Sequence, residues 1–245
     1  MTTNKYHLAL IKIFEENQAV ADNNAWVAHY VGTDKKLYQI DTATRKKIIK
    51  DYLKSVNPTF SEFKDLLLSL ANGSSFEELS SMGTVLELYP KYRHDLSPKI
   101  VDKLFDHVCG WAEVDITCTF SADDMLANWP EWEKLLTDFN VDANIHKRRA
   151  SLVLLTLPLR HSPDQKFVDL AFANVEILKS ETDILITKAV SWVLRTMIIF
   201  HPDIVRDYLE KNKDTLPKIA IRETSTKLLT GKKYVNKKKN GEIRG

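Results

Sequence analysis

The chain of 245 residues is poor in residues that interrupt helices, with only 7 glycines and 8 prolines. Few stretches alternate apolar and polar residues in the way that half-buried strands do. Such a composition favours long helices with short connections and argues against a sheet-based fold. With 44% apolar and 28% charged residues, the chain is large enough to bury a core. The sequence predicts an all-α protein.

Cysteines and long apolar runs are scarce as well. Cys109 and Cys118 are the only cysteines and have no CxxC partner, so neither a disulfide framework nor a zinc site is indicated. The histidines are scattered, and the sequence contains no HExxH motif, Gly-rich phosphate loop or GxSxG motif. No apolar run approaches the roughly 18 residues of a membrane span, and no leader pattern opens the chain. We therefore expect a soluble cytoplasmic protein that uses no metal, cofactor or membrane.

The net charge of +2 is distributed unevenly. The segment TGKKYVNKKKNGEIRG at the end of the sequence carries five net positive charges, which leaves the remaining residues net acidic. The pattern predicts a helical domain over residues 1–230 and a basic disordered tail over 231–245. The tail is read either as a solubilising end or as a loose attachment to a polyanion.

Local sequence signals place several helix boundaries. Asp22 and Thr42 are plausible N-caps for the two helices that follow them, and Ser75-x-x-Glu78 has the form of a capping box. Proline lacks a backbone N–H, but in the first turn of a helix that N–H would have no intrahelical partner. Ser97-Pro98 therefore predicts another helix start. Prolines mark further predicted helix boundaries at Pro90, which ends the helix before it, and at Pro130, Pro163, Pro202 and Pro217.

Two segments of the chain repeat each other at a distance of 39 residues. Residues 148–172 align without a gap with residues 187–211, which matches Ala150 to Ala189, Leu155 to Leu194 and Pro163-Asp164 to Pro202-Asp203. A helix, a Pro-Asp turn and a second helix, repeated near every 40 residues, are typical of HEAT-like solenoids. The sequence therefore predicts a HEAT-like α-α superhelix of stacked helix pairs.

Basic residues gather near the starts of several predicted helices. A helix N-terminus and nearby cations together favour phosphate, and the repeated pattern on a net acidic body suggests a nucleic-acid backbone as the partner. At each place alone, an ordinary solvated helix end is the better explanation of these residues. The clusters are Arg45-Lys46-Lys47, Lys147-Arg148-Arg149, Lys188 with Arg195, and Lys218 with Arg222.

The segment GWAEVDITC at 110–118 places a carboxylate in apolar company. Read as a helix, it puts Trp111 and Asp115 on one face, four residues apart. A carboxylate there must reach water, find a partner or serve a reaction. These nine residues alone favour a solvent-exposed Asp115.

Four segments in this order resemble the AlkD branch of the DNA alkylation repair glycosylases over roughly residues 20–230. They are WVAHYVGTDKKLYQIDTATRKK, GWAEVD, HKRRAS and KAVSWVLR. The resemblance implies a HEAT-like fold, a catalytic cleft and a duplex DNA partner. It places the cleft residues at Asp115, Trp111, Trp192 and Arg149, and further DNA contacts at Tyr30 and Arg45. Relatives often have glycine where Gln39 stands and an aromatic-rich loop where this chain has Asp34-Lys35-Lys36.

The implied activity is excision of positively charged N3- or N7-alkylated purines by hydrolysis of the N-glycosidic bond. Asp115 would stabilise the charge that develops on the sugar and orient water, the two indoles would face sugar and lesion, and Arg149 would fix a phosphate and orient Asp115. The implied protein is a monomer that grips alkylated duplex DNA by its phosphates. A second hypothesis stays open: a non-catalytic HEAT-like module that binds unusual DNA or a protein. The carboxylate favours the first, and the altered loop at 34–39 keeps the second open.

Overall fold

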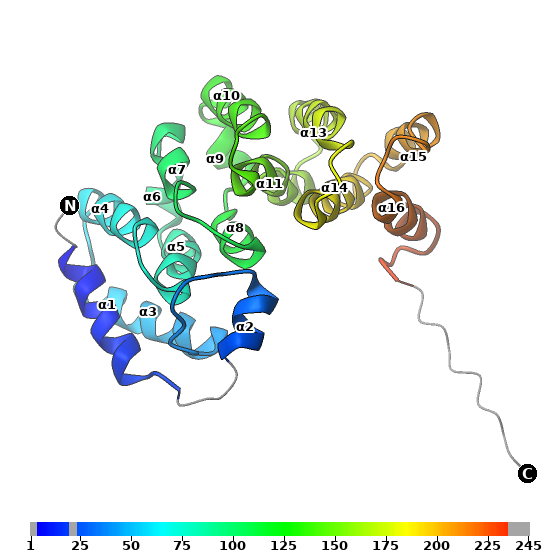
Figure 1. Ribbon diagram of the computed structural model, residues 1–245. Helices are drawn as coiled ribbons and strands as arrows, with labels where there is room; N and C mark the ends of the chain where they lie inside the picture. The colour runs from blue at the N-terminus through cyan, green and yellow to red at the C-terminus, as the bar shows by residue number, and fades with distance from the viewer. Residues whose placement is uncertain (1–3, 20–23, 235–245) are drawn as a thin grey trace, which may run out of the picture. The chain divides into compact units, whose positions relative to one another are not determined.

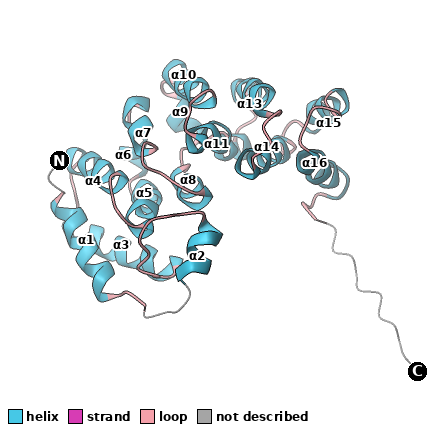
Figure 2. Ribbon diagram, viewed as in Figure 1, coloured by secondary structure: helices cyan, strands magenta, loops and turns pink. Residues whose placement is uncertain are grey.

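Helices make up the structure, a computed structural model that describes residues 4–19 and 24–234 (Figures 1 and 2). Within these ranges no strand forms, and the only strand-like feature is an isolated bridge between Lys36 and Ser75. The chain divides into two compact units, residues 1–158 and 159–245. The all-α class predicted from the sequence is confirmed. The prediction of one domain over 1–230 stays a prediction.

The first unit contains helices α1 to α11, and α12 crosses its boundary. In chain order these helices are α1 (Lys5–Glu16), α2 (Asn24–Val31), α3 (Thr42–Val56), α4 (Phe60–Ala71), α5 (Phe76–Leu88), α6 (Pro90–His94), α7 (Pro98–Leu104), α8 (Trp111–Thr117), α9 (Ala122–Leu126), α10 (Trp129–Asn140), α11 (Ile145–Val153) and α12 (Thr156–His161). Helices α4, α7 and α10 are neighbours in one row, and α5, α8 and α11 form a second row packed against it (Figure 1). This pairing of rows is the HEAT-like arrangement that the sequence predicts.

The second unit contains α13 (Gln165–Leu178), α14 (Ile184–Met197), α15 (Pro202–Lys211) and α16 (Lys218–Thr230). Helix α14 packs against each of the other three. The predicted repeat is confirmed at the level of helix, turn and helix, since Ala150 and Ala189 are both fully buried and so are Leu155 and Leu194. The first copy differs because a break at residues 154–155 separates α11 from α12, whereas α14 is continuous.

Helix α5 lies at the centre of the first unit. It packs against α3, α4 and α8, and nearly all of its residues are buried. Gly83 allows the close approach of α8, because a Cβ atom there would lie 2.2 Å from the carbonyl oxygen of Ile116. The absence of a side chain at Gly83 therefore sets how deeply α8 sits against the core.

Two predicted caps need correction. The N-cap of α3 is Asp41, not Thr42, because the Asp41 carboxylate accepts hydrogen bonds from the amides of Ala43 and Thr44. An aspartate one residue earlier can reach both unpaired amides of the first turn, so the helix begins at Thr42. The Ser75 capping box is only half formed: Ser75 caps the Glu78 amide, but the Glu78 carboxylate accepts from the Ser74 amide and bonds to His7.

The predicted proline boundaries agree with the structure. Pro98, Pro130 and Pro202 stand in the first turns of α7, α10 and α15, and Pro90 begins α6. Pro217 precedes α16, and Pro163 lies just before the Asp164 cap of α13. Proline punctuates this chain at helix starts because its missing N–H would be unpaired there in any case.

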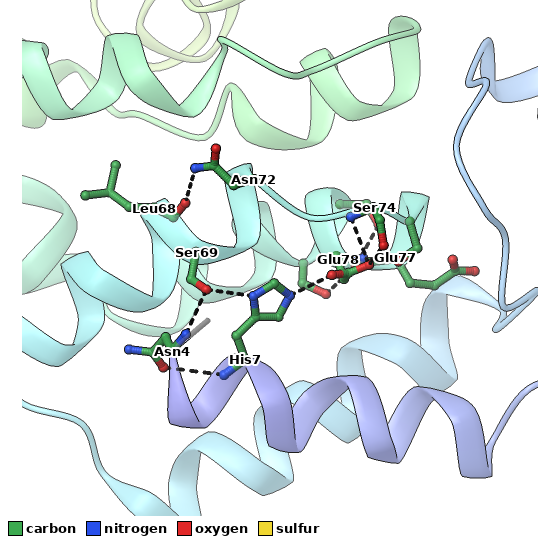
Figure 3. A network of polar contacts seen from close by, with 11 residues as sticks. Asn4, His7, Leu68, Ser69, Asn72, Ser74, Glu77 and Glu78 are labelled. Carbon is green, nitrogen blue, oxygen red and sulfur yellow. Dashed lines mark hydrogen bonds and ion pairs between the residues drawn. The ribbon is translucent and has the colours of Figure 1, made fainter. Parts of the chain in front are cut away.

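The His7 side chain joins α1 to α4 and α5 in a buried polar network (Figure 3). Its Nε2 lies 2.8 Å from Glu78 Oε1, and its Nδ1 lies 2.8 Å from Ser69 Oγ. Burial opposes ionisation of Glu78, but hydrogen bonds from His7 and Ser75 outweigh it, and the pKa of Glu78 lies below its ordinary value. The network provides hydrogen-bond partners for polar groups that would otherwise be buried without any.

The ends of two predictions fall outside the described residues. The proposed cap Asp22 lies in the undescribed 20–23, and most of the predicted basic tail lies beyond residue 234. Helix α16 ends at Gly231 in the left-handed conformation, after which Lys233 lies 3.5 Å from the Glu223 carboxylate and Tyr234 donates to it. No described helix is both long and apolar enough to cross a membrane.

Candidate active site

The short helix α8 carries the two residues of GWAEVD that the sequence places on one face. Ala112 and Val114 are buried, while Trp111 and Asp115 are partly exposed one turn apart. Gly110, at a φ of +79°, leads into the helix, and a Cβ atom on it would lie 2.3 Å from the Gly32 carbonyl oxygen. Only glycine fits this approach, which brings the loop after α2 against the start of α8.

Trp111 and Asp115 border a cleft of about 540 Å³ that lies wholly within the first unit. Five elements contribute to its walls: α2, the segment before α3, α3 itself, α5 and α8. The lining combines apolar side chains with a few polar groups, as small-molecule and base-binding sites do. Its polar and aromatic lining residues include Tyr30, Gln39, Asp41, Arg45, Phe76, Glu77, Trp111 and Asp115.

Asp115 is not the solvent-exposed carboxylate that its nine-residue context favoured. Arg149 of α11 binds it through two hydrogen bonds, Nε to Oδ1 at 2.9 Å and Nη2 to Oδ2 at 2.8 Å. The Arg149 side chain is 5% exposed and that of Asp115 is 15% exposed. Burial raises the pKa of Asp115 above its ordinary value, and Arg149 offsets part of that rise. The Asp115 carboxylate is therefore a largely desolvated anion that Arg149 holds in a fixed orientation beside the cleft.

Three aromatic rings continue from α8 onto α2. The Trp111 indole nitrogen donates to the Tyr30 carbonyl oxygen at 2.6 Å, and the two rings meet edge to face with centroids 5.6 Å apart. On its other side Tyr30 stacks on Trp26, with centroids 5.4 Å apart and planes 6° from parallel. Trp26 and Tyr30 are 66% and 57% exposed, so flat apolar faces remain open beside the cleft. The sequence did not predict Trp26 as part of this aromatic group, although its i, i+4 spacing to Tyr30 indicates that the two rings share a helix face.

Arg45 and Gln39 also line the cleft. Arg45 is 3% exposed and lies over the Phe76 ring, and its Nε atom has no hydrogen-bond partner among the described residues. Gln39 adopts a φ of +57°, which side chains rarely do. The Glu77 carboxylate holds this turn by accepting from the amides of Tyr38 and Ile40. A glycine at position 39 would adopt this backbone conformation without strain.

The other basic residues predicted in the first unit lie away from the cleft lining. Lys46 is exposed on α3 and pairs with Glu87 at 3.0 Å. Lys147 bridges Asp102 and Asp106, both at 2.7 Å, and Arg148 donates to the carbonyl oxygens of Asp142 and Ala143. These contacts occupy the charged groups of Lys147 and Arg148. Their role as phosphate ligands stays a prediction.

The remaining predicted residues belong to the second unit. Lys188, Trp192 and Arg195 recur at spacings of four and three along α14 and so share one face, opposite its buried residues. Arg195 lies 3.4 Å from the buried Glu223 carboxylate of α16 and donates to Ser191. Arg222 is exposed on α16. The structure therefore brings Asp115, Trp111, Arg149, Tyr30 and Arg45 together in one unit and Trp192 with its basic neighbours in the other.

The described residues contain no group of three or more His, Cys, Asp or Glu side chains arranged to hold a metal ion. A further acidic residue, Glu113, lies fully buried behind the face that carries Trp111 and Asp115. The sequence shows it only as a polar residue within the GWAEVD motif, and nothing in the motif distinguishes an inward from an outward glutamate.

Comparison with known proteins gives a family match over most of the chain. A family model described as DNA alkylation repair enzyme matches residues 14–228. A solved structure described as a predicted DNA alkylation repair enzyme from Enterococcus faecalis aligns over 87% of this chain and 98% of its own, with a TM-score of 0.69 and 19% sequence identity. At that identity the structural likeness shows the fold alone. Comparison with curated proteins gives no match.

Proposed function

The chain belongs to the family of DNA alkylation repair enzymes, and from this premise we propose that it is a monofunctional DNA glycosylase. Its substrate would be a purine that carries positive charge after alkylation at N3 or N7, and its reaction the hydrolysis of the N-glycosidic bond in base excision repair. One observation carries the proposal: a carboxylate, Asp115, is fixed by Arg149 at the wall of a cleft that also presents the aromatic faces of Tyr30 and Trp111.

A cationic base is already a good leaving group, so the site needs no strong acid. Cleavage builds positive charge on the deoxyribose, as in other oxocarbenium-like reactions, and a desolvated anion stabilises that charge well. Asp115 supplies the anion and orients the attacking water. Arg149 keeps the carboxylate ionised despite burial, since removing a charge from water without a partner would favour its neutral form.

The aromatic residues complete the proposed site. Indole faces attract cations, and we propose this role for Trp111 of the first unit and for Trp192 of the second. Tyr30 would position Trp111 through the hydrogen bond from the indole to its carbonyl oxygen. Arg45, whose buried Nε atom has no hydrogen-bond partner in the described part of the chain, would donate to a DNA phosphate.

The partner is duplex DNA containing alkylated bases, contacted mainly through phosphates by Lys46, Lys147, Arg148, Lys188, Arg195 and Arg222. We expect a monomer that needs no cofactor and acts where the chromosome lies, in the cytoplasm. Phosphate contacts carry no sequence information, so binding would be independent of sequence and sensitive to salt.

A non-catalytic DNA-binding module is the second candidate. The observation that favours it is Gln39, whose side chain occupies part of the cleft wall. Incubation of the purified protein with methylated duplex DNA, followed by mass spectrometry of the released bases, separates the two. The glycosylase releases 7-methylguanine or 3-methyladenine, whereas the module binds the duplex and releases neither. DNA binding without release from either lesion would overturn the catalytic proposal.

A further inference from the structure

Glu113 is a fully buried carboxylate on α8 with no ion pair to any described basic side chain. A buried carboxylate without a cationic partner destabilises the fold unless other groups donate hydrogen bonds to it. Its neighbours in the chain, Trp111 and Asp115, face the cleft, while Glu113 points into the protein. The residue therefore lies behind the proposed site rather than in it.

The Glu113 carboxylate joins two loops. Its Oε2 accepts from the backbone amide of Cys109, 2.7 Å away, and its Oε1 accepts from the Thr33 hydroxyl, 2.9 Å away. Thr33 follows α2, and Cys109 precedes α8. The same two loops touch at Gly32 and Gly110, where a Cβ atom on Gly32 would lie 3.2 Å from the Gly110 Cα. Glu113 thus fastens the end of α2 to the start of α8.

This connection holds the contact between Tyr30 and Trp111. Tyr30 lies one turn before Thr33, and Trp111 lies two residues after Cys109. The indole donates to the Tyr30 carbonyl oxygen at 2.6 Å, and the rings meet nearly at right angles. A shift of one loop against the other would change this contact directly.

We propose that Glu113 is a positioning residue that sets Trp111 and Asp115 relative to α2 by bridging Thr33 and Cys109. The geometric part of this inference stands without any activity, and only its effect on excision rests on the proposed function. Glu113 touches no reacting atom and acts through the loops it joins.

Burial raises the pKa of Glu113 to about 6, while hydrogen bonds from Cys109 and Thr33 and the charge of Lys35 act to lower it. The bridge therefore changes protonation in an accessible pH range. Other ionisable groups nearby are Asp34, which accepts from the Cys109 thiol at 3.1 Å, and His146, which interacts with Asp34. On the α5 side, Glu77 and Glu78 bind backbone amides and His7 instead.

The indole N–H signal of Trp111 reports on this bridge in a nitrogen-15 NMR spectrum. Trp111→Phe assigns the signal, and a pH titration of the parent protein should move it with a midpoint near pH 6. Glu113→Gln should abolish the step, because the amide does not titrate. His146→Asn is the matched control and should leave the step in place. A step that persists unchanged in Glu113→Gln would overturn the inference.

Thr33→Val gives a second test in case the glutamine variant fails to fold. It removes one donor that favours the charged carboxylate, so the midpoint should move above that of the parent. A merely space-filling Glu113 predicts no shift. In single-turnover excision, Glu113→Gln should be about 10- to 100-fold slower with DNA affinity unchanged, as expected for small misplacements of reacting groups. Absence of excision in the parent would refute the proposed function, and the NMR titration would still decide this inference.

Discussion

The guanidinium of Arg149 and the carboxylate of Asp115 face each other through two hydrogen bonds of 2.9 and 2.8 Å, from α11 to α8. Such bidentate pairing fixes direction as well as charge. Because both side chains are largely buried, each charge is compensated mainly by the other rather than by water. The stability of the first unit and the chemistry of the cleft therefore depend on the same pair.

Removal of Arg149 should destabilise the protein strongly. Arg149→Ala leaves Asp115 buried without its partner, and breaking a buried pair in this way costs about 3–5 kcal/mol. Urea unfolding measures the loss. In an Asp115→Asn background the same substitution should cost clearly less, since no charge is then stranded. Equal losses in both backgrounds would show that the two residues are not coupled.

Substitution of Gln39 by glycine should stabilise the fold. A non-glycine residue in the left-handed region destabilises the folded state by about 1–2 kcal/mol, a strain that glycine removes. The greater backbone freedom of glycine stabilises the unfolded chain and offsets about 0.5–1 kcal/mol of that gain. We expect a net gain of about 0.5–1 kcal/mol for Gln39→Gly by thermal or urea unfolding. Gln39→Ala is the matched control, because it also removes the side chain but keeps the strain. If alanine stabilises as much as glycine, backbone strain is not the cause.

Glu113 should make stability depend on pH with a defined sign. Its folded pKa of about 6 lies above the ordinary value of 4.5, so the folded state holds the proton more tightly than the unfolded state. This contribution is complete below about pH 4.5 and is lost as pH rises through 6, a difference of about 2 kcal/mol. The difference in unfolding free energy between the parent protein and Glu113→Gln should therefore fall by that amount as the pH rises from 4.5 to 7. A flat difference contradicts the raised pKa.

Lys188 should contribute to DNA binding through its charge. It is exposed on the α14 face that also presents Trp192 and Arg195. Loss of one phosphate contact lowers the slope of log K against log salt by about one unit, so Lys188→Gln should show that change in fluorescence anisotropy titrations. Lys134→Gln removes the same charge from α10 and should leave the slope unaltered. Similar slopes for both variants would remove α14 from the DNA surface.

Sequence patterns predicted the fold well because each signal was local. Proline at first turns, the spacing of apolar residues and the 39-residue repeat act within one or two helices, and the structure agrees with them. The errors were local too. Asp41 and Thr42 are both good caps, and only the backbone geometry decides between them.

The candidate site was less accessible from sequence because its decisive contacts join distant segments. Nothing in GWAEVDITC indicates that Asp115 meets Arg149, 34 residues later. The resemblance to a family supplied both residues, whereas residues outside its motifs, such as Trp26 and Glu113, were not predicted. Conversely, Lys147 looked like a free cation in sequence, but two aspartates from another helix and its following loop bind it.

Asp115 gives the most direct test of the proposed chemistry. The measurement is single-turnover release of 7-methylguanine from a defined duplex, with the parent protein compared with Asp115→Asn at saturating protein. Loss of one electrostatic contact to a charged transition state typically costs about 2.7–4 kcal/mol, so the rate should fall by a factor of roughly 10²–10³ while DNA affinity stays equal or rises slightly. Equal release rates in the two proteins would contradict the catalytic role of Asp115.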